Sequence, residues 1–388
     1  MVNFDDTATA FITKSNAQLR KAYYMFKMVG NTTLVSLGKR ATSLSMALRL
    51  PIKGLVKKTV YDQFVGGETM QECEKIIDLL DRYNVKSLLD YSIEGKETEE
   101  DFEHTKNCLL DTIRFGGKHK AVPFAVFKVT GMARFALLEK VSNGELLSEK
   151  ESKEWLKAKE RVKEICQAAH DHKLAVLVDA EESWIQPAID ELAEEMIHHY
   201  NRERVIVFNT LQMYRVDRLE YLRKLVNLAN KENFYLGVKL VRGAYMEKER
   251  DRAAKMGYPS PIQPDKAASD RDYDQGVEYV VENLEKGRLV AGSHNEESCR
   301  KLANLMVEKG LAKDDHRIWF SQLYGMSDHL SFNLAKAGYN VVKYLPFGPV
   351  KETLPYLIRR AEENSSASGQ TSRELMLIQK EMRRRGID

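Results

Sequence analysis

The stretch SKEWLKAKERVKEICQAAHDHKLAVLVDA, residues 152–180, contains one complete helix-to-strand unit. Its first part, residues 152–172, spaces apolar side chains as an amphipathic helix does. Its last part, LAVLVDA at residues 174–180, is apolar almost throughout, which is typical of a strand buried on both faces. A helix that leads directly into such a strand indicates a parallel sheet joined by right-handed crossovers.

The same alternation extends to both sides of this unit. Short runs rich in apolar or β-branched residues recur, and helical stretches separate most of them: 85–91, 123–129, 174–180, 204–211, 235–242, 288–294, 317–323 and 339–345. Roughly eight strands over about 280 residues match a closed (β/α)8 barrel better than an open sheet. We therefore predict an α/β fold, a distorted TIM-type barrel with extra helices at its two ends.

The chain divides into three parts. Residues 1–78 look like an N-terminal helical, basic arm, and residues 79–364 hold the predicted barrel. Residues 365–388 begin with SSASGQTS (365–372), which is typical of a flexible joint, and end in a C-terminal helix.

Charge is distributed unevenly between the arm and the rest. Residues 1–60 carry ten basic side chains and two acidic ones, a net charge of +8, so the remainder is net −5 within a whole-chain charge of +3. Two interpretations are open: the arm meets an anionic membrane, or it packs on the acidic body. Because the basic residues are confined to the arm, a nucleic-acid partner is not expected.

Other sequence signals exclude several classes of site. The cysteines are far apart, without the spacing of a zinc site, and are typical of reduced thiols in a cytosolic-type compartment: Cys73, Cys108, Cys166 and Cys299. No metal site is predicted. No G-x-G-x-x-G follows a strand, so a dinucleotide site of the Rossmann type is not expected.

Polar residues gather where the predicted strands end, at the edge that carries the active site of a (β/α)8 barrel: Lys128, Asp179, Gln212, Arg242, His294, Asn295 and Tyr344. Lys128 and Asp179 are each the one ionisable residue in the body of an apolar strand. A charge there is costly unless it faces a wet, charged site. The cluster of such residues therefore predicts an active site at this edge.

Two adjacent arginines, Arg359 and Arg360, lie in PYLIRRAEEN (355–364). On a helix they would form a fork, with Tyr356 one turn before and Glu363 one turn after. One interpretation is a solvated face with weak ion pairs. The other is a clamp for a carboxylate, whose geometry a guanidinium matches.

Five motifs in sequence order resemble the proline dehydrogenase family: KLVRGAYMEKE (239–249), SHN (293–295), QLYGMSD (322–328), KYLPFGP (343–349) and PYLIRRAEENSS (355–366). The resemblance begins near VYDQFVGGET (60–69) and continues to the end of the chain. It implies FAD-dependent oxidation of L-proline to Δ1-pyrroline-5-carboxylate, by hydride transfer from C5, with electrons passed to a membrane quinone. The length leaves no room for an aldehyde dehydrogenase domain, which implies the monofunctional form. A cytoplasmic location is expected. The basic charge of the arm is consistent with peripheral contact to the inner membrane.

The resemblance also implies roles for individual residues. Around the substrate it implies a carboxylate clamp, a charged pair and the pocket walls, in that order: Arg359 and Arg360; Lys128 and Asp179; Tyr344, Tyr356, Leu323, Ala244 and Tyr245. Around FAD it implies Gln212, Lys239, Val241, Arg242, Gly243, Ala244, Ser293, His294, Asn295 and Glu363. Two positions depart from parts of the family: Lys239 stands where some members have arginine, and Met246 where bifunctional members have tryptophan.

Three alternatives stay open. Hydroxyproline dehydrogenases belong to the same family, although the hydroxyl of Tyr344 beside the substrate ring predicts a preference for proline. A barrel lyase could use Lys128 as a Schiff-base nucleophile. A barrel that binds without catalysis is the third, and the full set of competent pocket residues disfavours it.

Overall fold

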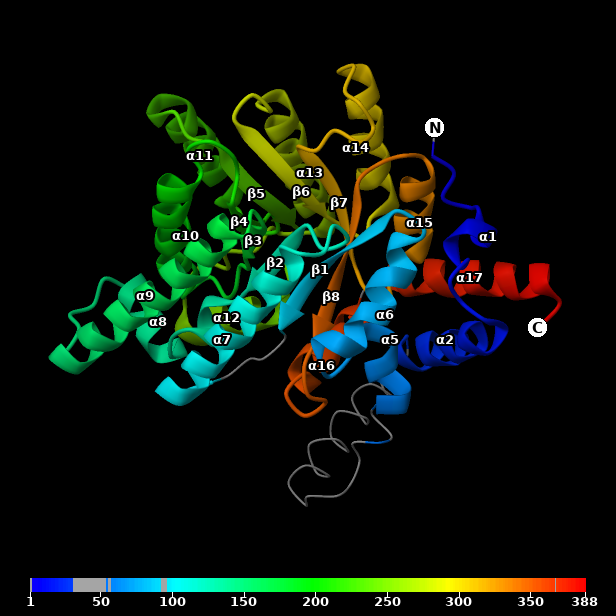
Figure 1. The fold of residues 1–388 in the computed structure, drawn as a ribbon, viewed down its shortest axis with the longest axis horizontal. Helices are drawn as coiled ribbons and strands as arrows, with labels where there is room; N and C mark the ends of the chain where they lie inside the picture. Colours follow the sequence, from blue (N-terminus) through cyan, green and yellow to red (C-terminus); the bar gives the residue numbers. More distant parts are fainter. Residues whose placement is uncertain (1, 31–53, 55–56, 92–95, 367) are drawn as a thin grey trace.

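The computed structural model describes residues 2–30, 54, 57–91, 96–366 and 368–388. Eight parallel strands form one closed barrel in the order β1 to β8 (Figure 1). Their bounds are Val85–Tyr91 (β1), Phe124–Phe127 (β2), Ala175–Val178 (β3), Val207–Gln212 (β4), Leu236–Val241 (β5), Gly287–Gly292 (β6), Ile318–Leu323 (β7) and Val341–Phe347 (β8). Strand β1 closes the barrel against β8, with register from Val85 opposite Val341 to Tyr91 opposite Phe347.

The helices fall into two groups. Those before β1 and after β8 are α1 (Thr7–Ala10), α2 (Asn16–Val29), a π-helical turn (Lys57–Tyr61), α5 (Asp62–Phe64), α6 (Met70–Asp81), α16 (Leu354–Ser366) and α17 (Ser368–Arg385). Those between strands are α7 (Glu99–Gly116), a 3-10 turn (Val129–Gly131), α8 (Phe135–Ser142), α9 (Glu149–Asp171), α10 (Gln186–Tyr200), α11 (Arg218–Glu232), α12 (Met246–Met256), α13 (Lys266–Glu282), α14 (Glu296–Glu308) and α15 (Asp328–Lys336). The predicted (β/α)8 barrel is confirmed, and each predicted strand overlaps an observed one.

Local sequence explains why the helices begin where they do. Helix α9 starts after Ser148, whose hydroxyl accepts from the Glu151 backbone N–H while the Glu151 carboxylate accepts from the Ser148 N–H. This reciprocal capping satisfies two amide groups that a helix start leaves without partners. Helices α7 and α6 begin in a similar way after Thr98 and Thr69, each of which accepts an amide with its side chain.

Two apolar layers hold the barrel together. The larger one lies between the strands and the surrounding helices and includes Val176, Val178, Ile165 and Ala169, none of them more than 1% exposed. The smaller one fills the inside of the barrel and consists of Leu88, Phe124, Val126, Leu177, Phe208, Val290, Val342 and Tyr344. The barrel is thus a filled core rather than a channel.

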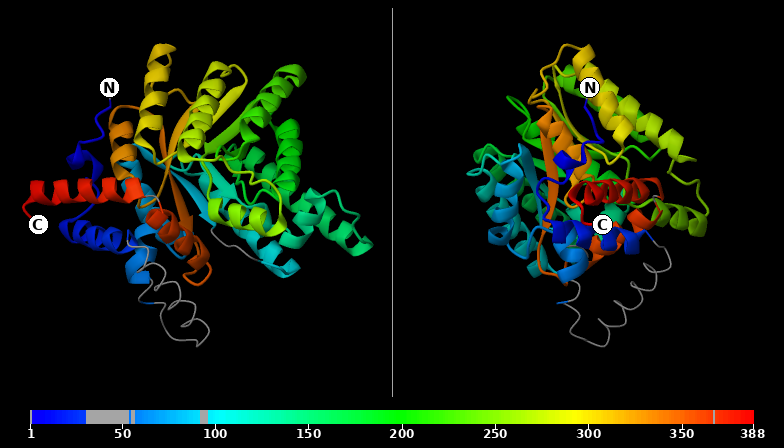
Figure 2. Two further views of the ribbon diagram at one scale, coloured as in Figure 1. Left: turned by 180° about the vertical axis from the view of Figure 1, so that it is seen from behind. Right: turned by 90° about the vertical axis from the view of Figure 1, so that its right-hand side faces the viewer.

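The described part of the N-terminal arm packs on the body. Helix α2 lies along α17, and α1 contacts α15 (Figure 2). A shared core contains Leu19 and Phe26 from α2 together with Leu377 and Ile378 from α17. Lys14 pairs with the buried carboxylate of Asp328 at 3.4 Å. Packing on the body therefore accounts for residues 2–30; much of the remaining basic arm, residues 31–53 and 55–56, lies outside the described residues.

The predicted joint at residues 365–372 has a different structure. Helix α16 continues to Ser366 and α17 begins at Ser368, so the described residues of this stretch are helical. Burial of Leu377 and Ile378 anchors α17 one or two turns further on. Such tertiary packing overrides the weak helix propensity of serine, threonine and glycine.

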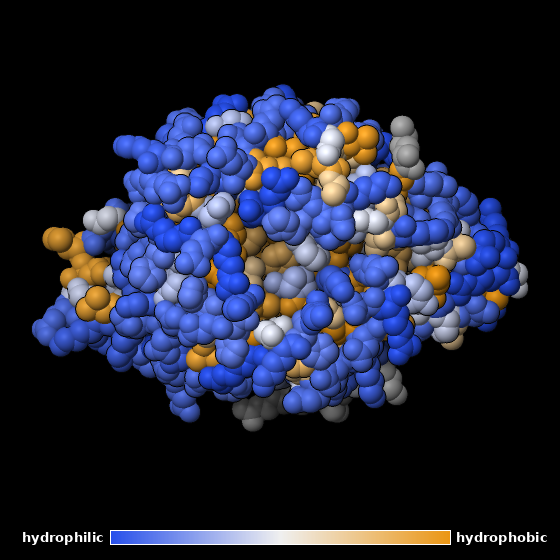
Figure 3. Space-filling model, turned by 45° about the horizontal axis from the view of Figure 1, so that its top comes forward, coloured by the Kyte–Doolittle hydropathy of each residue, from blue (hydrophilic) through white to orange (hydrophobic). Residues whose placement is uncertain are grey.

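The face shown in Figure 3 is mainly hydrophilic, with apolar side chains in the middle of the face and at its left end. None of the helices in the described part of the chain combines the length and the apolar character that a membrane span requires.

Candidate active site

Strand alternation decides which side chains reach the inside of the barrel. Val126, Leu177 and Val342 belong to the interior layer, so the residue two positions after each also faces inward. Those residues are Lys128, Asp179 and Tyr344. Gln212 and His294 follow the interior residues Phe208 and Val290 by four positions and share the same direction. The alternation therefore brings the predicted polar residues of five strands together at one end of the barrel.

Asp179 is the centre of the resulting cluster. Its Oδ2 lies 3.3 Å from the Lys128 Nζ and accepts a 3.0 Å hydrogen bond from the Tyr344 hydroxyl. Its Oδ1 accepts from the Nζ of Lys239, whose ammonium group also lies 5.0 Å from the centre of the Tyr344 ring. Thus two residues predicted for substrate and one predicted for the cofactor meet at a single carboxylate.

Burial and charge pairing together decide the protonation states in the cluster. Burial would raise the pKa of Asp179, but the positive charges of Lys239 and Lys128 outweigh it and lower the pKa to about 2. Burial and the Asp179 charge raise the pKa of Tyr344 well above its usual value, so its hydroxyl stays protonated. The charge of Asp90 also raises the pKa of Tyr344, so two carboxylates, Asp179 and Asp90, lie near the two lysines.

Helix α16 brings the paired arginines to this end of the barrel. The guanidinium carbon of Arg359 lies 5.6 Å from the centre of the Tyr245 ring, just after β5. That of Arg360, a residue only 7% exposed, lies 5.1 Å from the centre of the Tyr356 ring. The charge of Arg360 also contributes to lowering the pKa of His294, which follows β6. The fork therefore lies near the carboxyl ends of β5 and β6.

Leu323, a predicted wall residue, connects the two layers of the site. It packs against the α16 core cluster that contains Tyr356 and Leu357, and also against the interior cluster that contains Tyr344. Tyr356 in turn contributes to raising the pKa of Tyr344. The three predicted wall residues on β7, β8 and α16 thus belong to one neighbourhood.

Arg242, at the end of β5, is held by partners on neighbouring elements. Its guanidinium donates to the hydroxyls of Ser293 and Ser298, both at 2.9 Å, and to the Asp270 carboxylate at 2.6 Å. Its guanidinium also lies over the Tyr273 ring, 4.5 Å from its centre. This arrangement places a cation that is paired with Asp270 beside the Ser293 hydroxyl, whereas the Ser298 hydroxyl donates to Asp274 at 2.6 Å.

The turn after β5 depends on a glycine. Gly243 has φ of +149°, and an added Cβ would collide with the ring of Tyr214. The next residue, Ala244, donates its N–H to the Gln212 Oε1 at 3.1 Å, and the Gln212 Nε2 donates to the Glu181 carbonyl at 2.7 Å. The backbone from Val241 to Tyr245 is partly exposed, whereas the strand before it is buried.

His294 is held as a neutral ring in one tautomer. Burial, with Lys343 and Arg360 nearby, lowers its pKa to about 3. Its Nε2 accepts from the Leu323 N–H at 3.4 Å, so its proton is on Nδ1, which lies 2.8 Å from the Ser327 Oγ.

The remaining predicted residues have simpler environments. Asn295 is the N-cap of α14, where its Oδ1 accepts from the N–H groups of Glu297 and Ser298. This capping contact explains why an asparagine is suited to position 295. The side chain of Glu363 lies outside the described residues.

Two residues in the same neighbourhood were not predicted. Glu181 follows Asp179 in DAEES, and its carboxylate accepts from the N–H and hydroxyl of Thr130 at 3.1 and 2.5 Å. It thereby fixes the loop after Lys128, and the run of acidic residues at the strand end was a signal for it. Ser327 touches His294 from the β7–α15 loop. It lies in the quoted motif QLYGMSD (322–328), but no role was predicted for it.

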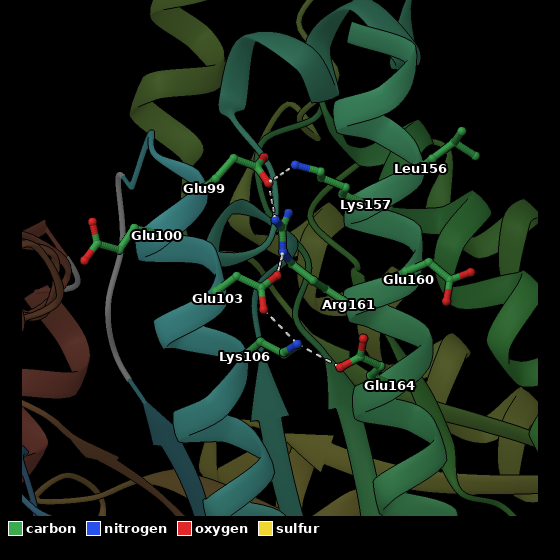
Figure 4. A pocket seen from close by; sticks show the side chains of 9 residues that line it. All are labelled: Glu99, Glu100, Glu103, Lys106, Leu156, Lys157, Glu160, Arg161 and Glu164. Carbon is green, nitrogen blue, oxygen red and sulfur yellow. Dashed lines mark hydrogen bonds and ion pairs between the residues drawn. The ribbon is translucent and has the colours of Figure 1, made fainter. Parts of the chain in front are cut away.

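A separate surface groove lies between α7 and α9 (Figure 4). Its charged residues pair across the two helices: Arg161 binds Glu99 at 2.5 Å and Glu103 at 2.7 Å, and Lys106 binds Glu103 and Glu164 at 2.8 Å. These pairs dock α7 onto α9.

The chain is similar to known proteins over most of its length. The "Proline dehydrogenase" family model matches residues 73–373. A "Carbapenem antibiotics biosynthesis protein CarD" of Pectobacterium carotovorum is 34% identical over 93% of this chain and 94% of its own. A "Hydroxyproline dehydrogenase" of Xenopus laevis is 32% identical over 97% and 88%, and a "Proline dehydrogenase 1, mitochondrial" of Dictyostelium discoideum is 30% identical over 98% and 74%.

Solved structures share the fold. Proline utilization A from Bdellovibrio bacteriovorus superposes with a TM-score of 0.71 at 19% identity, covering 92% of this chain. The chain spans 38% of the length of that larger protein. Since the family model covers well over half of the chain and the barrel carries the expected residues at its mouth, the chain belongs to the proline dehydrogenase family of oxidoreductases.

Proposed function

We propose that this protein oxidises L-proline to Δ1-pyrroline-5-carboxylate with FAD as its cofactor. The observation that carries the proposal is the position of Arg359 and Arg360 on α16, at the barrel end that holds the Lys128–Asp179–Tyr344 cluster. A small imino acid has one carboxylate, one amine and an apolar ring. The site offers a guanidinium fork for the first and aromatic and leucine walls for the last.

The fork and the walls have separate tasks. The guanidinium groups of Arg359 and Arg360 bind the carboxylate through paired, charge-assisted hydrogen bonds. Tyr344, Tyr356 and Leu323 bound the ring and limit its size. Because these three residues come from β8, α16 and β7, the pocket shape depends on correct docking of α16.

The residues predicted for the cofactor fit a flavin dinucleotide. Arg242 with Ser293 supplies a cation and a hydroxyl group for a diphosphate. The partly exposed backbone at residues 241–245 gives a flat ring system access without a side chain at Gly243. Gln212 and Lys239 supply polar groups on the inner side of the barrel, where a ring with carbonyl and N–H edges would meet them.

FAD, when bound, supplies the acceptor for two electrons taken from C5 of proline. The residues of this chain must present the substrate with a neutral amine, since a protonated nitrogen has no lone pair to assist the loss of hydride. Lys128 bears a positive charge beside the pocket and disfavours a second cation on the substrate. We therefore expect kcat/KM to rise through an ionisation at or above neutral pH.

We propose a membrane quinone as the final electron acceptor, with peripheral contact to a membrane through the basic arm. The support is the part of the arm after the packed residues 2–30: residues 31–60 hold six basic and no acidic side chains, a net charge of +6 that an anionic surface attracts. Vesicle flotation with and without residues 1–60, at equal quinone content, tests this part. Equal flotation of both forms would refute the membrane contact without affecting the chemistry of the site.

Hydroxyproline oxidation is the second candidate, because a relative at 32% identity carries that name. Tyr344 argues against it: its ring lies in the interior layer and its hydroxyl is directed to Asp179, which leaves little room for a substituted ring. The lyase alternative is disfavoured because Lys128 pairs with Asp179 as an ammonium group, whereas a Schiff-base nucleophile must be neutral.

The visible spectrum of the purified protein tests the proposal directly. We expect flavin absorption bands that bleach when L-proline is added without oxygen, and bleach more slowly with hydroxyproline. A protein that binds no flavin, or whose flavin bands do not respond to proline, would refute the proposed function.

A further inference from the structure

A chain of hydrogen bonds leads from the C-terminal helix to the active-site histidine. The Glu374 Oε2, on α17, accepts from the Ser327 N–H at 3.1 Å. The Ser327 Oγ lies 2.8 Å from the His294 Nδ1, and the His294 Nε2 accepts from the Leu323 N–H. Glu374 and Ser327 are 7% and 5% exposed, so water does not compete for these contacts.

Ser327 needs an external partner to keep its conformation. Its φ is +50°, in the left-handed region that a residue with a side chain adopts reluctantly. The carboxylate of Glu374 binds its N–H and so stabilises this backbone, which in turn directs the hydroxyl at the histidine. Lys343 supports the same loop from β8, since its Nζ donates to the Met326 carbonyl at 2.5 Å and pairs with Asp328 at 2.9 Å.

The serine hydroxyl decides the state of the histidine. A neutral imidazole carries one proton, and acceptance of the Leu323 N–H at Nε2 requires that proton on Nδ1. The Ser327 Oγ is the acceptor in reach of that N–H. Removing it would leave the Nδ1–H without this partner, so the ring could rotate or exchange tautomers.

We infer that Glu374 and Ser327 are positioning residues that fix the tautomer and orientation of His294, and with them the place of Leu323 beside the substrate. The importance of this for turnover rests on the proposed function, in which His294 meets the flavin and Leu323 meets proline. Glu374 lies just beyond residues 73–373 that match the family, so the part of α17 that holds it lies outside the matched segment.

Two variants and one matched control test the inference in the full-length holoenzyme. Ser327→Gly removes the hydroxyl and also relieves the left-handed strain, so it favours folding. Glu374→Ala removes the carboxylate. Glu381→Ala is the control, because Glu381 is a fully buried glutamate on the same helix whose carboxylate binds Arg384 at 2.8 Å and Arg385 at 2.7 Å instead of the loop.

Nitrogen-15 NMR of the labelled histidine rings gives the decisive measurement, with His294 assigned by a His294→Gln sample. In the unaltered protein and in Glu381→Ala we expect one protonated and one unprotonated nitrogen, without titration between about pH 5 and 8. In Ser327→Gly and Glu374→Ala we expect the shifts of the two ring nitrogens to move towards a common average, because both tautomers become populated. KM for proline should increase about three- to tenfold in these two variants, as expected for one lost buried hydrogen bond.

The test of the positioning role can be distinguished from the test of proline oxidation. Unchanged ring shifts in both variants, or an equal change in Glu381→Ala, would overturn the positioning role. Because the ring shifts are read without proline, they test the hydrogen-bond chain even if the unaltered protein fails to oxidise proline. That failure would refute the proposed function alone.

Discussion

The Tyr344 hydroxyl donates a 3.0 Å hydrogen bond to the Asp179 Oδ2, across the inside of the barrel from β8 to the end of β3. The same oxygen faces the Lys128 ammonium group at 3.3 Å. Tyr344 is therefore both a wall of the pocket and a partner of its charged centre. Mutation can separate the effect of the Tyr344 ring from the effect of its hydroxyl group.

Replacing Tyr344 with serine removes the ring. We expect the kcat/KM ratio of hydroxyproline to proline to increase, because space opens where a ring substituent would lie. Activity on proline should fall, since the wall and the bond to Asp179 are both lost. Tyr344→Phe is the matched control, because it keeps the wall and should leave the ratio low. Steady-state kinetics on both substrates provide the measurement, and an unchanged ratio in Tyr344→Ser would disprove the steric explanation.

Asp179→Asn tests the charged centre. The substitution leaves Lys128 and Lys239 facing each other without a carboxylate, and loss of one partner of a buried ion pair costs about 3 to 5 kcal/mol. Because the folded pKa of Asp179 is lowered to about 2, its stabilisation is present above the usual carboxyl range near pH 4 and is lost as the pH falls towards 2.

Urea unfolding at pH 7 measures that cost, with Asp111→Asn as the control. Asp111 pairs with Arg114 at 2.6 Å on the surface, where such a pair contributes about 0 to 1 kcal/mol. Similar losses for the two variants would show that Asp179 is not the buried counter-ion of the two lysines.

The barrel was predictable from sequence because its strands are buried on both faces. Strand β1 matches the predicted residues 85–91, and β4 begins at Val207, three residues later than the predicted start at 204. The position of Lys128 and Asp179 at the active-site edge followed from the barrel prediction. Strand composition and alternation are local properties, so one sequence is enough to show them.

Contacts between distant segments were not predictable in this way. The bond from Lys239 to Asp179 joins β5 to β3, and in sequence Lys239 is only a cation in an apolar run. Glu374 reads as one more charged residue of a charged helix, although it is buried against the β7–α15 loop. The helical structure around residues 365–372 likewise depends on the packing of α17 on α2. Each of these features requires the tertiary arrangement.

His329 gives the protein a specific sensitivity to acid. The ring is 3% exposed, its Nδ1 and Nε2 lie 3.9 Å from the carboxylates of Glu374 and Glu296, and its pKa is lowered to about 3 by burial and by Arg373 and Lys343. Between pH 3 and 6.5 the unfolded chain therefore binds a proton that the folded protein does not. Stability must fall as the pH falls through this window, by about 2 kcal/mol at pH 5 for this group.

His329→Gln should remove that contribution. We expect the loss of unfolding free energy between pH 7 and pH 5 to shrink by about 2 kcal/mol relative to the unaltered protein. His316→Gln is the control, since the His316 side chain is 82% exposed and should leave the pH dependence unchanged. The explanation fails if both variants lose as much stability in acid as the unaltered protein does.

The paired arginines provide the most direct test of substrate binding. Arg359→Gln and Arg360→Gln each replace a guanidinium with a neutral group that still fills space on α16. A charged hydrogen bond contributes about 1.5 to 3 kcal/mol, so KM for proline should increase about 10- to 100-fold in each variant. Arg360 is the more buried of the two, and its loss should have the larger effect. The flavin spectrum should be retained, because the residues predicted for the cofactor are unchanged. Arg383→Gln, at a side chain 74% exposed on α17, is the control and should bind proline normally. If either fork variant oxidised proline with unaltered KM and kcat, that arginine would have no part in holding the carboxylate, and the site would need a different anion-binding group.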